Sequence, residues 1–522
     1  MRGSLAPRRT TWLAAATAIL AVGLLMASGD ARAGEAAATE FRRAAYSADF
    51  TSGVTKLKTM ATADPNDVEA VFGTGALQFI GAFATLQHNL YRHSAATTAA
   101  TGMPGAGLSA FGMMGWAFAT PVVVPPNPNA QPMTYKALRS MLERFATDLT
   151  AAEATLALIK DRPVKIVFEP GRIALDLNNN GAVEPGERVF EAMMGWRAPR
   201  AQQTGLEIAF DTADASWLRG YSHVMMATAN LVLAFDFEKT FEATAHNSYG
   251  LATTAIGREI QRQMATGRPA PVVQKLIADL DSKINVLQAQ RNAMFSEQSE
   301  QRKRMAALPR PPEAQAERLA LMEEQRAVQA GLGPVNVELN TLTTQRRDLQ
   351  SEQNGMPPGN DYTGFFDIVA AVHSISWNVV EPARLKAVRT HLLQVMALNK
   401  NTWRLVRAES DDDREWLPNA RQTSPFGVRV TDEIIDSWLA TTALAEQVLE
   451  GKKLLPHPRF RNKGVNLKKF LETTKRFDLV MTVTGHDLLP YLEEGEIVDG
   501  DTWRTLTNPM QGNLAMFAVW FN

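Results

Sequence analysis

The residues best suited to bind a cation lie in one short stretch, where residues with side-chain oxygens recur at short intervals. These oxygens belong to Asp176, Asn178, Asn180, Glu184 and Glu187. Gly181 follows the third of them, at a point where the chain has to turn sharply. Calcium takes roughly six to eight oxygen ligands at about 2.3–2.6 Å, from carboxylates, amides, backbone carbonyls and water. The pattern therefore predicts a calcium site, with Ca²⁺ as the cofactor.

The stretch resembles the metal-binding loop of the EF-hand superfamily, and the resemblance covers residues 176–187 only. It implies side-chain ligands at positions one, three, five, nine and twelve, and a backbone carbonyl at position seven. Position eight is Val183, the usual apolar anchor. The implied metal ligands are Asp176, Asn178, Asn180, the Ala182 carbonyl, Glu184 directly or through water, and bidentate Glu187.

Three departures from the family pattern set the expected affinity. The segment before the loop reads as extended chain rather than as an entering helix, and Arg188 stands where the family has an apolar residue. Positions three and five are Asn, so the loop has fewer carboxylates to attract the ion. We therefore expect weak binding, with a dissociation constant of ~10⁻⁴–10⁻³ M. The alternative is an Asn/Gly turn that caps the next helix.

A structural role for the ion is favoured over a sensor role, because sensor loops work in pairs and the sequence has no second loop. Asp211–Asp214 and Asp499–Asp501 are short acidic turns that lack the rest of the pattern. The eight His residues show no zinc-protease spacing, and no nucleophile elbow, phosphate loop or dinucleotide fingerprint occurs. His223 and His373 lie on apolar segments and are the best candidates for a catalytic pair, but no catalytic residue is assigned.

The N-terminus has the features of an export signal. Basic residues precede an apolar run from Trp12 to Met26, and Ala31-Arg32-Ala33 forms a small-x-small cleavage site. We expect an exported protein, periplasmic or secreted, without a membrane span after signal cleavage. The chain has 0 Cys, which excludes disulfides and thiolate metal sites. Lys+Arg number 54 against 55 Asp+Glu, so there is no basic excess to bind nucleic acid.

The predicted fold class is mainly α, a multi-helix body with a few short strands and a projecting coiled-coil hairpin. Apolar residues spaced by three and four predict helices over 135–160, 214–237, 365–377, 385–405 and 430–449. Three more are expected between 40 and 93, with a break at 64–67 that resembles the junction in tetratricopeptide repeats near 64–70; an ordinary helical hairpin is favoured. Short strands are expected at 164–168, 173–175, 479–484 and 515–521. The segment 97–133 is apolar, irregular and expected to cover a core or line a groove.

Residues 271–354 differ in composition, being rich in Gln, Glu, Arg, Ala and Leu. Apolar residues between Val273 and Met294 alternate steps of four and three, the seam of a coiled coil. Prolines at 309–312 and the Gly-Leu-Gly-Pro stretch at 331–334 are expected to divide the segment into three helices. It is either an arm that binds a protein partner or an insertion that packs on itself.

These observations divide the chain into four parts: a signal peptide at 1–33, a helical domain with the calcium loop at 34–270, a coiled-coil insertion at 271–354, and a helical continuation with short strands at 355–522. The expected function is that of an exported calcium-binding protein, with structural calcium in a non-catalytic binding or scaffold protein. The alternative is a hydrolase or other enzyme with a pocket among the apolar helices, near His223, His373 or the 97–133 segment.

Overall fold

The computed structural model describes most of the chain. It covers residues 34–93, 127, 129–184, 187–189, 205–249, 251–266, 268–309, 312–353, 363–412, 415–423, 429–510, 517–518 and 521. The expected signal peptide and nearly all of the 97–126 segment lie outside these residues. The chain forms two compact units, one made of residues up to Thr254 and from Ile368 onward, the other of Ala255–Asp367. The expected insertion at 271–354 lies within the second unit.

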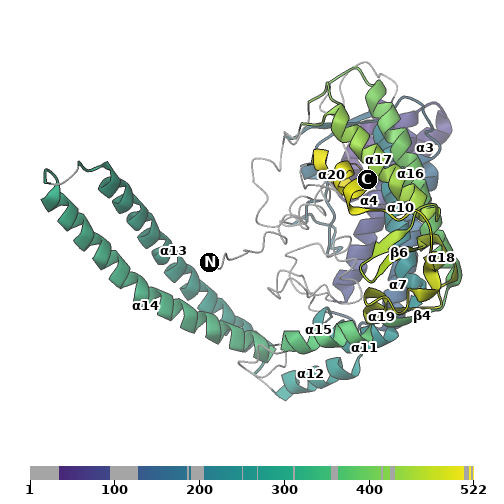
Figure 1. Cartoon of the computed structure of the whole chain (residues 1–522). Coiled ribbons are helices and arrows are strands. Elements are labelled where there is room, and N and C mark those ends of the chain that lie inside the picture. The colour runs from purple at the N-terminus through teal and green to yellow at the C-terminus, as the bar shows by residue number, and fades with distance from the viewer. Residues whose placement is uncertain are drawn as a thin grey trace. The chain divides into compact units, whose positions relative to one another are not determined.

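The fold is mainly helical, as expected, and Figure 1 shows the helices of each unit. The longer helices of the first unit are α2 (Glu35–Tyr46), α3 (Phe50–Ala63), α4 (Val68–Arg92), α7 (Tyr135–Leu156), α10 (Thr212–Leu233), α16 (Pro382–Ala408) and α17 (Asp432–Leu449). Shorter ones are α11 (Glu238–Thr244), α18 (Leu467–Thr473), α19 (Leu479–Val483) and α20 (Gly500–Thr507). Helix α15 (Thr363–Ser374) spans the boundary between the units.

Helix α10 lies at the centre of the first unit, where it packs against α7 and α16. Its N-terminus is fixed by Asp211, which accepts hydrogen bonds from the backbone of Ala213 and Asp214, while the Asp214 carboxylate accepts one from the Asp211 N–H. Such a reciprocal cap satisfies donors that have no partner within the helix. Trp217 and Leu218 are buried on this helix, as its apolar composition predicts.

Amphipathic spacing predicted the neighbouring helix α7 closely. Its buried side chains are the ones expected from the three-and-four pattern, namely Leu138, Met141, Leu142, Phe145, Leu149, Ala152 and Leu156. Helix α4 packs against both α3 and α7. By length and hydropathy α4 is the one described helix that could cross a membrane, but 78% of its most apolar window is buried inside the protein. The core helix of a protein can have the same length and hydropathy.

Short antiparallel strands complete the first unit. Strand β1 (Lys165–Phe168) pairs with β2 (Ile208–Asp211), with Lys165 opposite Asp211. The strands β3 (Phe235–Asp236), β4 (Ser376–Val379) and β7 (Arg476–Asp478) form a second sheet in the order β3-β4-β7. The strands β5 (Leu455–His457), β6 (Phe460–Val465) and β8 (Leu492–Glu493) form a third in that order. β1 was expected, whereas β2 was not, because Ile208, Ala209 and Phe210 are all buried and show no alternation.

Several expected elements are wrong. Leu479–Val483 is helix α19 rather than a strand, and Trp377 belongs to β4 rather than to the end of a helix. Residues 173–175 form no named strand; Ala174 makes only an isolated bridge to Arg188. The expected final strand fails at its described residues, because the Phe521 N–H bonds to the Phe517 carbonyl four residues earlier, which is helical spacing.

The second unit contains α12 (Ala255–Thr266) and an antiparallel pair of long helices, α13 (Ala270–Ala307) and α14 (Gln315–Gln353). Ile284 on α13 packs against Val335 and Leu339 on α14. The expected break at 331–334 does not occur, and Pro334 lies inside α14. A side chain at Gly331 would place its Cβ 2.8 Å from Met294 Cε, so this glycine gives room for Met294 on the facing helix rather than ending its own.

Candidate metal centre

The predicted calcium loop is closed at its base by backbone pairing. The Leu175 N–H bonds to the Glu187 carbonyl at 2.9 Å, and the Val189 N–H bonds to the Ile173 carbonyl at 3.0 Å. The chain therefore enters and leaves the loop as a short extended pair, which agrees with the departure from an entering helix noted above. Pro185 and Gly186 lie outside the described residues, as does the chain from 190 to 204.

Asp176, at position one, folds inward under the turn. Its two carboxylate oxygens accept hydrogen bonds from the backbone of Asn180 at 3.0 Å and of Gly181 at 2.9 Å. Its side chain is 8% exposed. The φ angles at Asp176, Asn179 and Gly181 are 42°, 56° and 81°, so the chain repeatedly adopts the left-handed conformation that Gly, Asn and Asp tolerate best. These residue types are therefore required by the turn as well as suited to a cation.

The two Asn side chains repeat the same local bond. Asn178 Oδ1 accepts from the Asn180 N–H at 3.0 Å, and Asn180 Oδ1 accepts from the Ala182 N–H at 2.8 Å. Ala182 is exposed, and Val183, the expected anchor, is half-buried. Hydrogen bonds of this kind hold each amide oxygen on the inner side of a turn. They also occur in plain Asx turns, so by themselves they do not distinguish a metal loop from a capping turn.

Glu187 lies in the interior of the loop. It is 1% exposed, and its carboxylate accepts hydrogen bonds from the backbone of Asn178 at 3.3 Å and of Glu184 at 2.8 Å. The acid at position twelve thus folds back onto positions three and nine. Asn178 Nδ2 also donates to Glu184 Oε2 at 2.9 Å. A buried carboxylate is costly unless it is hydrogen-bonded or paired with a cation.

The loop is attached to the N-terminal helices. His88 on α4 lies with Nε2 2.6 Å from the Asp176 carbonyl, and the Ala174 N–H bonds to the Ala45 carbonyl at the end of α2 at 2.9 Å. Just before the loop, the Arg172 guanidinium lies 4.4 Å from the ring centre of Tyr46. An ion in the loop would therefore stabilise the contact between the loop and these helices.

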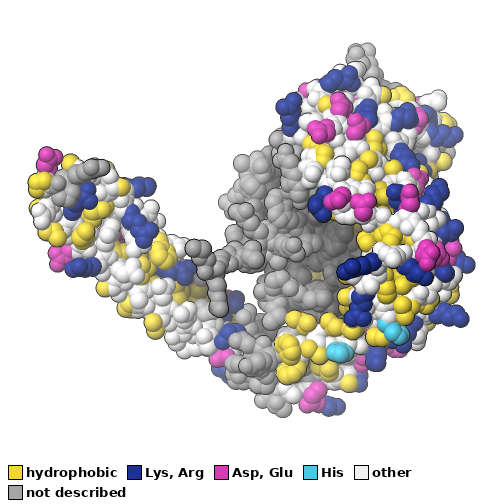
Figure 2. Space-filling model, in the orientation of Figure 1, with side chains coloured by type: hydrophobic (Ala, Val, Ile, Leu, Met, Phe, Trp, Pro, Cys, Tyr) yellow, Lys and Arg dark blue, Asp and Glu magenta, His cyan; other side chains and the backbone are white. Residues whose placement is uncertain are grey.

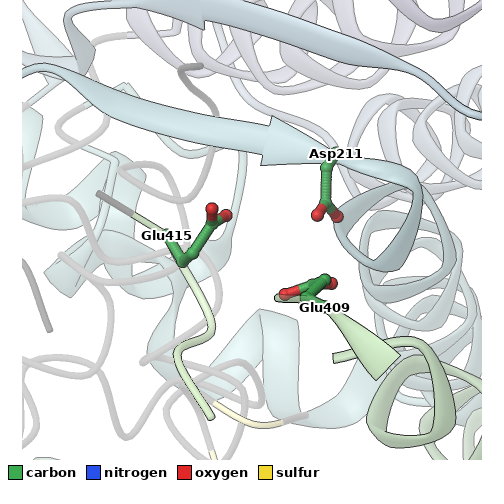
Figure 3. Close-up of side chains that lie close together, drawn as sticks. All are labelled: Asp211, Glu409 and Glu415. Carbon is green, nitrogen blue, oxygen red and sulfur yellow. The ribbon is translucent and has the colours of Figure 1, made fainter. Parts of the chain in front are cut away.

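A second acidic site was missed by the sequence interpretation. Asp211, Glu409 and Glu415 are the one group of at least three His or acidic side chains in the described ranges whose ligand atoms all lie within 4.8 Å of one another. Figure 3 shows the three carboxyl groups directed toward a common space. Asp211 ends β2, Glu409 follows α16, and Glu415, 1% exposed, bridges to Ala209.

The three carboxyl groups change one another's protonation. Burial, with the charges of Asp211 and Glu415, raises the pKa of Glu409 to about 10. Burial also raises the pKa of Asp211, against the opposing effect of a hydrogen bond with Glu409. At neutral pH Glu409 is therefore a carboxylic acid that donates to Asp211. The sequence signal for this site was weak, since Asp211 looked like a turn residue and Glu409 and Glu415 flank an acidic run interpreted as solvated.

Histidines also come together, but not as the sequence suggested. His223 Nδ1 lies 2.9 Å from His391 Nδ1, whereas His373 is exposed on α15. Glu153 on α7 lies 3.6 Å from His223 Nε2 and accepts a hydrogen bond from Arg219 at 2.9 Å. Burial, with a smaller contribution from His223, lowers the pKa of His391 to about 4, so this ring is neutral at pH 7.

Comparison with known proteins identifies no family for the chain. A scan against protein-family models finds no match, and searches of the curated proteins and of the solved structures find no similar protein at a significant level. The function must therefore be argued from the loop and the clusters themselves.

Proposed function

We propose that the chain is an exported calcium-binding protein in which a single loop, Asp176–Glu187, holds a structural calcium ion, and that the protein binds or organises other molecules without catalysis of its own. The observation that carries the proposal is the fold-back of Glu187, whose buried carboxylate is bonded to the backbone of positions three and nine. A capping box would account for the bond from the Glu184 N–H three residues earlier, but not for the bond from the Asn178 N–H nine residues earlier.

The ion's role follows from the attachments of the loop. His88 and the end of α2 bond to the backbone at the start of the loop, so a bound ion stabilises the packing of α2 and α4 on the body. The signal-like residues 1–33 support export to a compartment where calcium is plentiful. Weak affinity is sufficient there, because occupancy depends on the ratio of free calcium to the dissociation constant.

Calcium is expected to stabilise the folded protein. At ~10 mM calcium, a dissociation constant of ~10⁻³–10⁻⁴ M corresponds to about 1.4–2.7 kcal/mol, which raises the melting temperature of a chain of this size by a few degrees. Magnesium at the same concentration should have little effect, since it demands a smaller octahedral site. Differential scanning calorimetry of the full chain in chelator, magnesium and calcium measures both shifts.

Glu187→Gln is the decisive variant for this experiment. The amide oxygen can accept only one of the two backbone hydrogen bonds, so the calcium-free variant should melt below wild type. The calcium-dependent shift, measured for each protein against its own calcium-free form, should disappear. Asn179→Gly is the matched control, because position 179 is exposed, supplies no ligand and has a φ that glycine adopts freely. A wild-type protein whose melting temperature does not move up to ~10 mM calcium would refute the proposal.

A scaffold role for the α13–α14 hairpin is the second candidate. Large apolar side chains are exposed on both helices, and Figure 2 shows apolar and charged side chains mixed over the hairpin surface. The exposed ones are Val272, Val286, Phe295, Leu319, Met322 and Val337. Exposed apolar side chains on a polar helix pair are typical of a surface that contacts another protein.

Deleting residues 271–354 is expected to leave the first unit folded. The two ends of the deletion are close in sequence to Arg268 and Glu352. These two residues form an ion pair, so a short Gly/Ser linker can join the ends. The shortened chain should keep a cooperative melting transition and the same calcium-dependent shift, measured by calorimetry. Loss of the transition would mean that the hairpin is part of the core and would exclude a separate arm.

A further inference from the structure

Two imidazole rings meet where α10 and α16 pack together. His223 Nδ1 and His391 Nδ1 are 2.9 Å apart, and the ring centres are 5.2 Å apart at an interplanar angle of 41°. One proton lies between the two nitrogens, because two lone pairs or two N–H groups would repel at this distance. His223 is 9% exposed, whereas His391 is half-buried, so the pair is within reach of solvent through His391.

The outer nitrogen of His223 faces a carboxylate. Glu153 Oε1 is 3.6 Å from Nε2 and is fixed by the Arg219 guanidinium, which donates to it at 2.9 Å. This contact favours a proton on Nε2 and directs the Nδ1 lone pair toward His391. A carboxylate behind a histidine is the arrangement that orients imidazole ligands in metal sites. The pair thus has two ligand nitrogens facing each other, and one of them already has its supporting carboxylate.

We propose that His223 and His391 bind one divalent transition-metal ion of the Zn²⁺ class through their Nδ1 atoms, with Glu153 orienting His223. The ion displaces the shared proton, which moves by way of solvent to Nε2 of His391, so each imidazole keeps one proton and stays uncharged. Zn–N bonds of about 2.0–2.1 Å at a tetrahedral angle separate two nitrogens by roughly 3.3 Å, so the rings need to part by only a few tenths of an ångström. Water completes the coordination.

The donor set selects the metal. Two imidazoles suit Zn²⁺, Cu²⁺ and Ni²⁺, whereas Ca²⁺ and Mg²⁺ prefer oxygen ligands. The site is therefore chemically distinct from the Asp176–Glu187 loop and rests on different residues.

Isothermal titration of the chelator-stripped full chain with Zn²⁺ alone tests the proposal. Wild type should bind one zinc ion, and His391→Gln and His223→Gln should each bind it at least tenfold more weakly. Glu153→Gln should weaken binding by about tenfold, as loss of a supporting carboxylate does in metal sites. His486→Gln is the control, because His486 is an exposed histidine paired with Asp487 on the surface.

A spectroscopic measurement separates ligation from a change of fold. Cu²⁺ bound to the wild-type chain should show electron paramagnetic resonance splitting from two nitrogens, which is lost in His391→Gln while the circular dichroism spectrum stays native. The proposal is overturned if wild type with a native spectrum binds no zinc, or if His391→Gln binds zinc as tightly as wild type.

Discussion

Replacing Glu409 with Gln is expected to raise the free energy of unfolding at alkaline pH, by several kcal/mol at pH 9, and to flatten its decline between pH 6 and pH 10. Most substitutions of half-buried polar residues destabilise a protein, so a gain of this size would be unusual. Chemical denaturation of wild type and variant at a series of pH values measures the effect.

The sign follows from the two pKa values of Glu409. In the unfolded chain the group titrates near 4.5, whereas in the folded protein burial and the neighbouring Asp211 and Glu415 raise the pKa to about 10. Between these values the folded state holds a proton that the unfolded state releases. The stabilisation is therefore complete below the unfolded pKa and is lost as the pH rises toward the folded value. Gln is neutral at every pH and still has N–H groups to donate to Asp211, so it avoids this loss.

Asp411→Asn provides the matched control. Asp411 lies two residues from Glu409, but a hydrogen bond with Lys165 lowers its pKa, so its contribution is lost on the acid side instead. The Asn variant should therefore keep the alkaline decline of wild type. If Glu409→Gln keeps the alkaline decline of wild type, Glu409 is not the group whose titration causes that decline.

The helices could be predicted from the sequence because their signal is local. In α7 every buried side chain follows the repeat of the helix, and the break at 64–67 coincides with the Asp67 cap of α4. Short apolar runs carry no such signal. Leu479–Val483 has five residues, too few to separate a strand from a helical turn, and its helical form depends on Asp478, which caps the Met481 N–H. Glycines are similarly ambiguous, since Gly331 serves a contact with Met294 rather than a break.

A site could likewise be predicted only where its residues are close together in sequence. The proposed calcium ligands are contiguous in sequence, so their order was visible, and the structure places their side chains in one hydrogen-bonded turn. Asp211, Glu409 and Glu415 come from segments about two hundred residues apart and meet only through the packing of α10 and α16. His391 was missed for the same reason. Nothing in its own helix indicates that it will face His223.

Asn180→Asp is expected to tighten calcium binding about tenfold, or 1.4 kcal/mol, and to lower the melting temperature of the calcium-free protein. Asp keeps the oxygen that accepts the Ala182 N–H at 2.8 Å, so the turn itself should persist. The new carboxylate at position five attracts a bound cation more strongly than a neutral amide does. Without an ion, it adds a negative charge to a loop that already contains Asp176, Glu184 and Glu187.

The two opposite effects make the variant a sharp test. Asn179→Asp adds the same charge one residue away, at an exposed position that supplies no ligand, so general attraction of calcium to an acidic loop would affect both variants alike. A metal site requires Asn180→Asp to gain much more affinity than Asn179→Asp in a calcium titration followed by calorimetry. A capping turn without metal would instead give two variants that are destabilised with and without calcium. Equal gains in calcium affinity for the two variants would contradict the site. They would mean that the added charge attracts calcium in general and that residue 180 does not coordinate it.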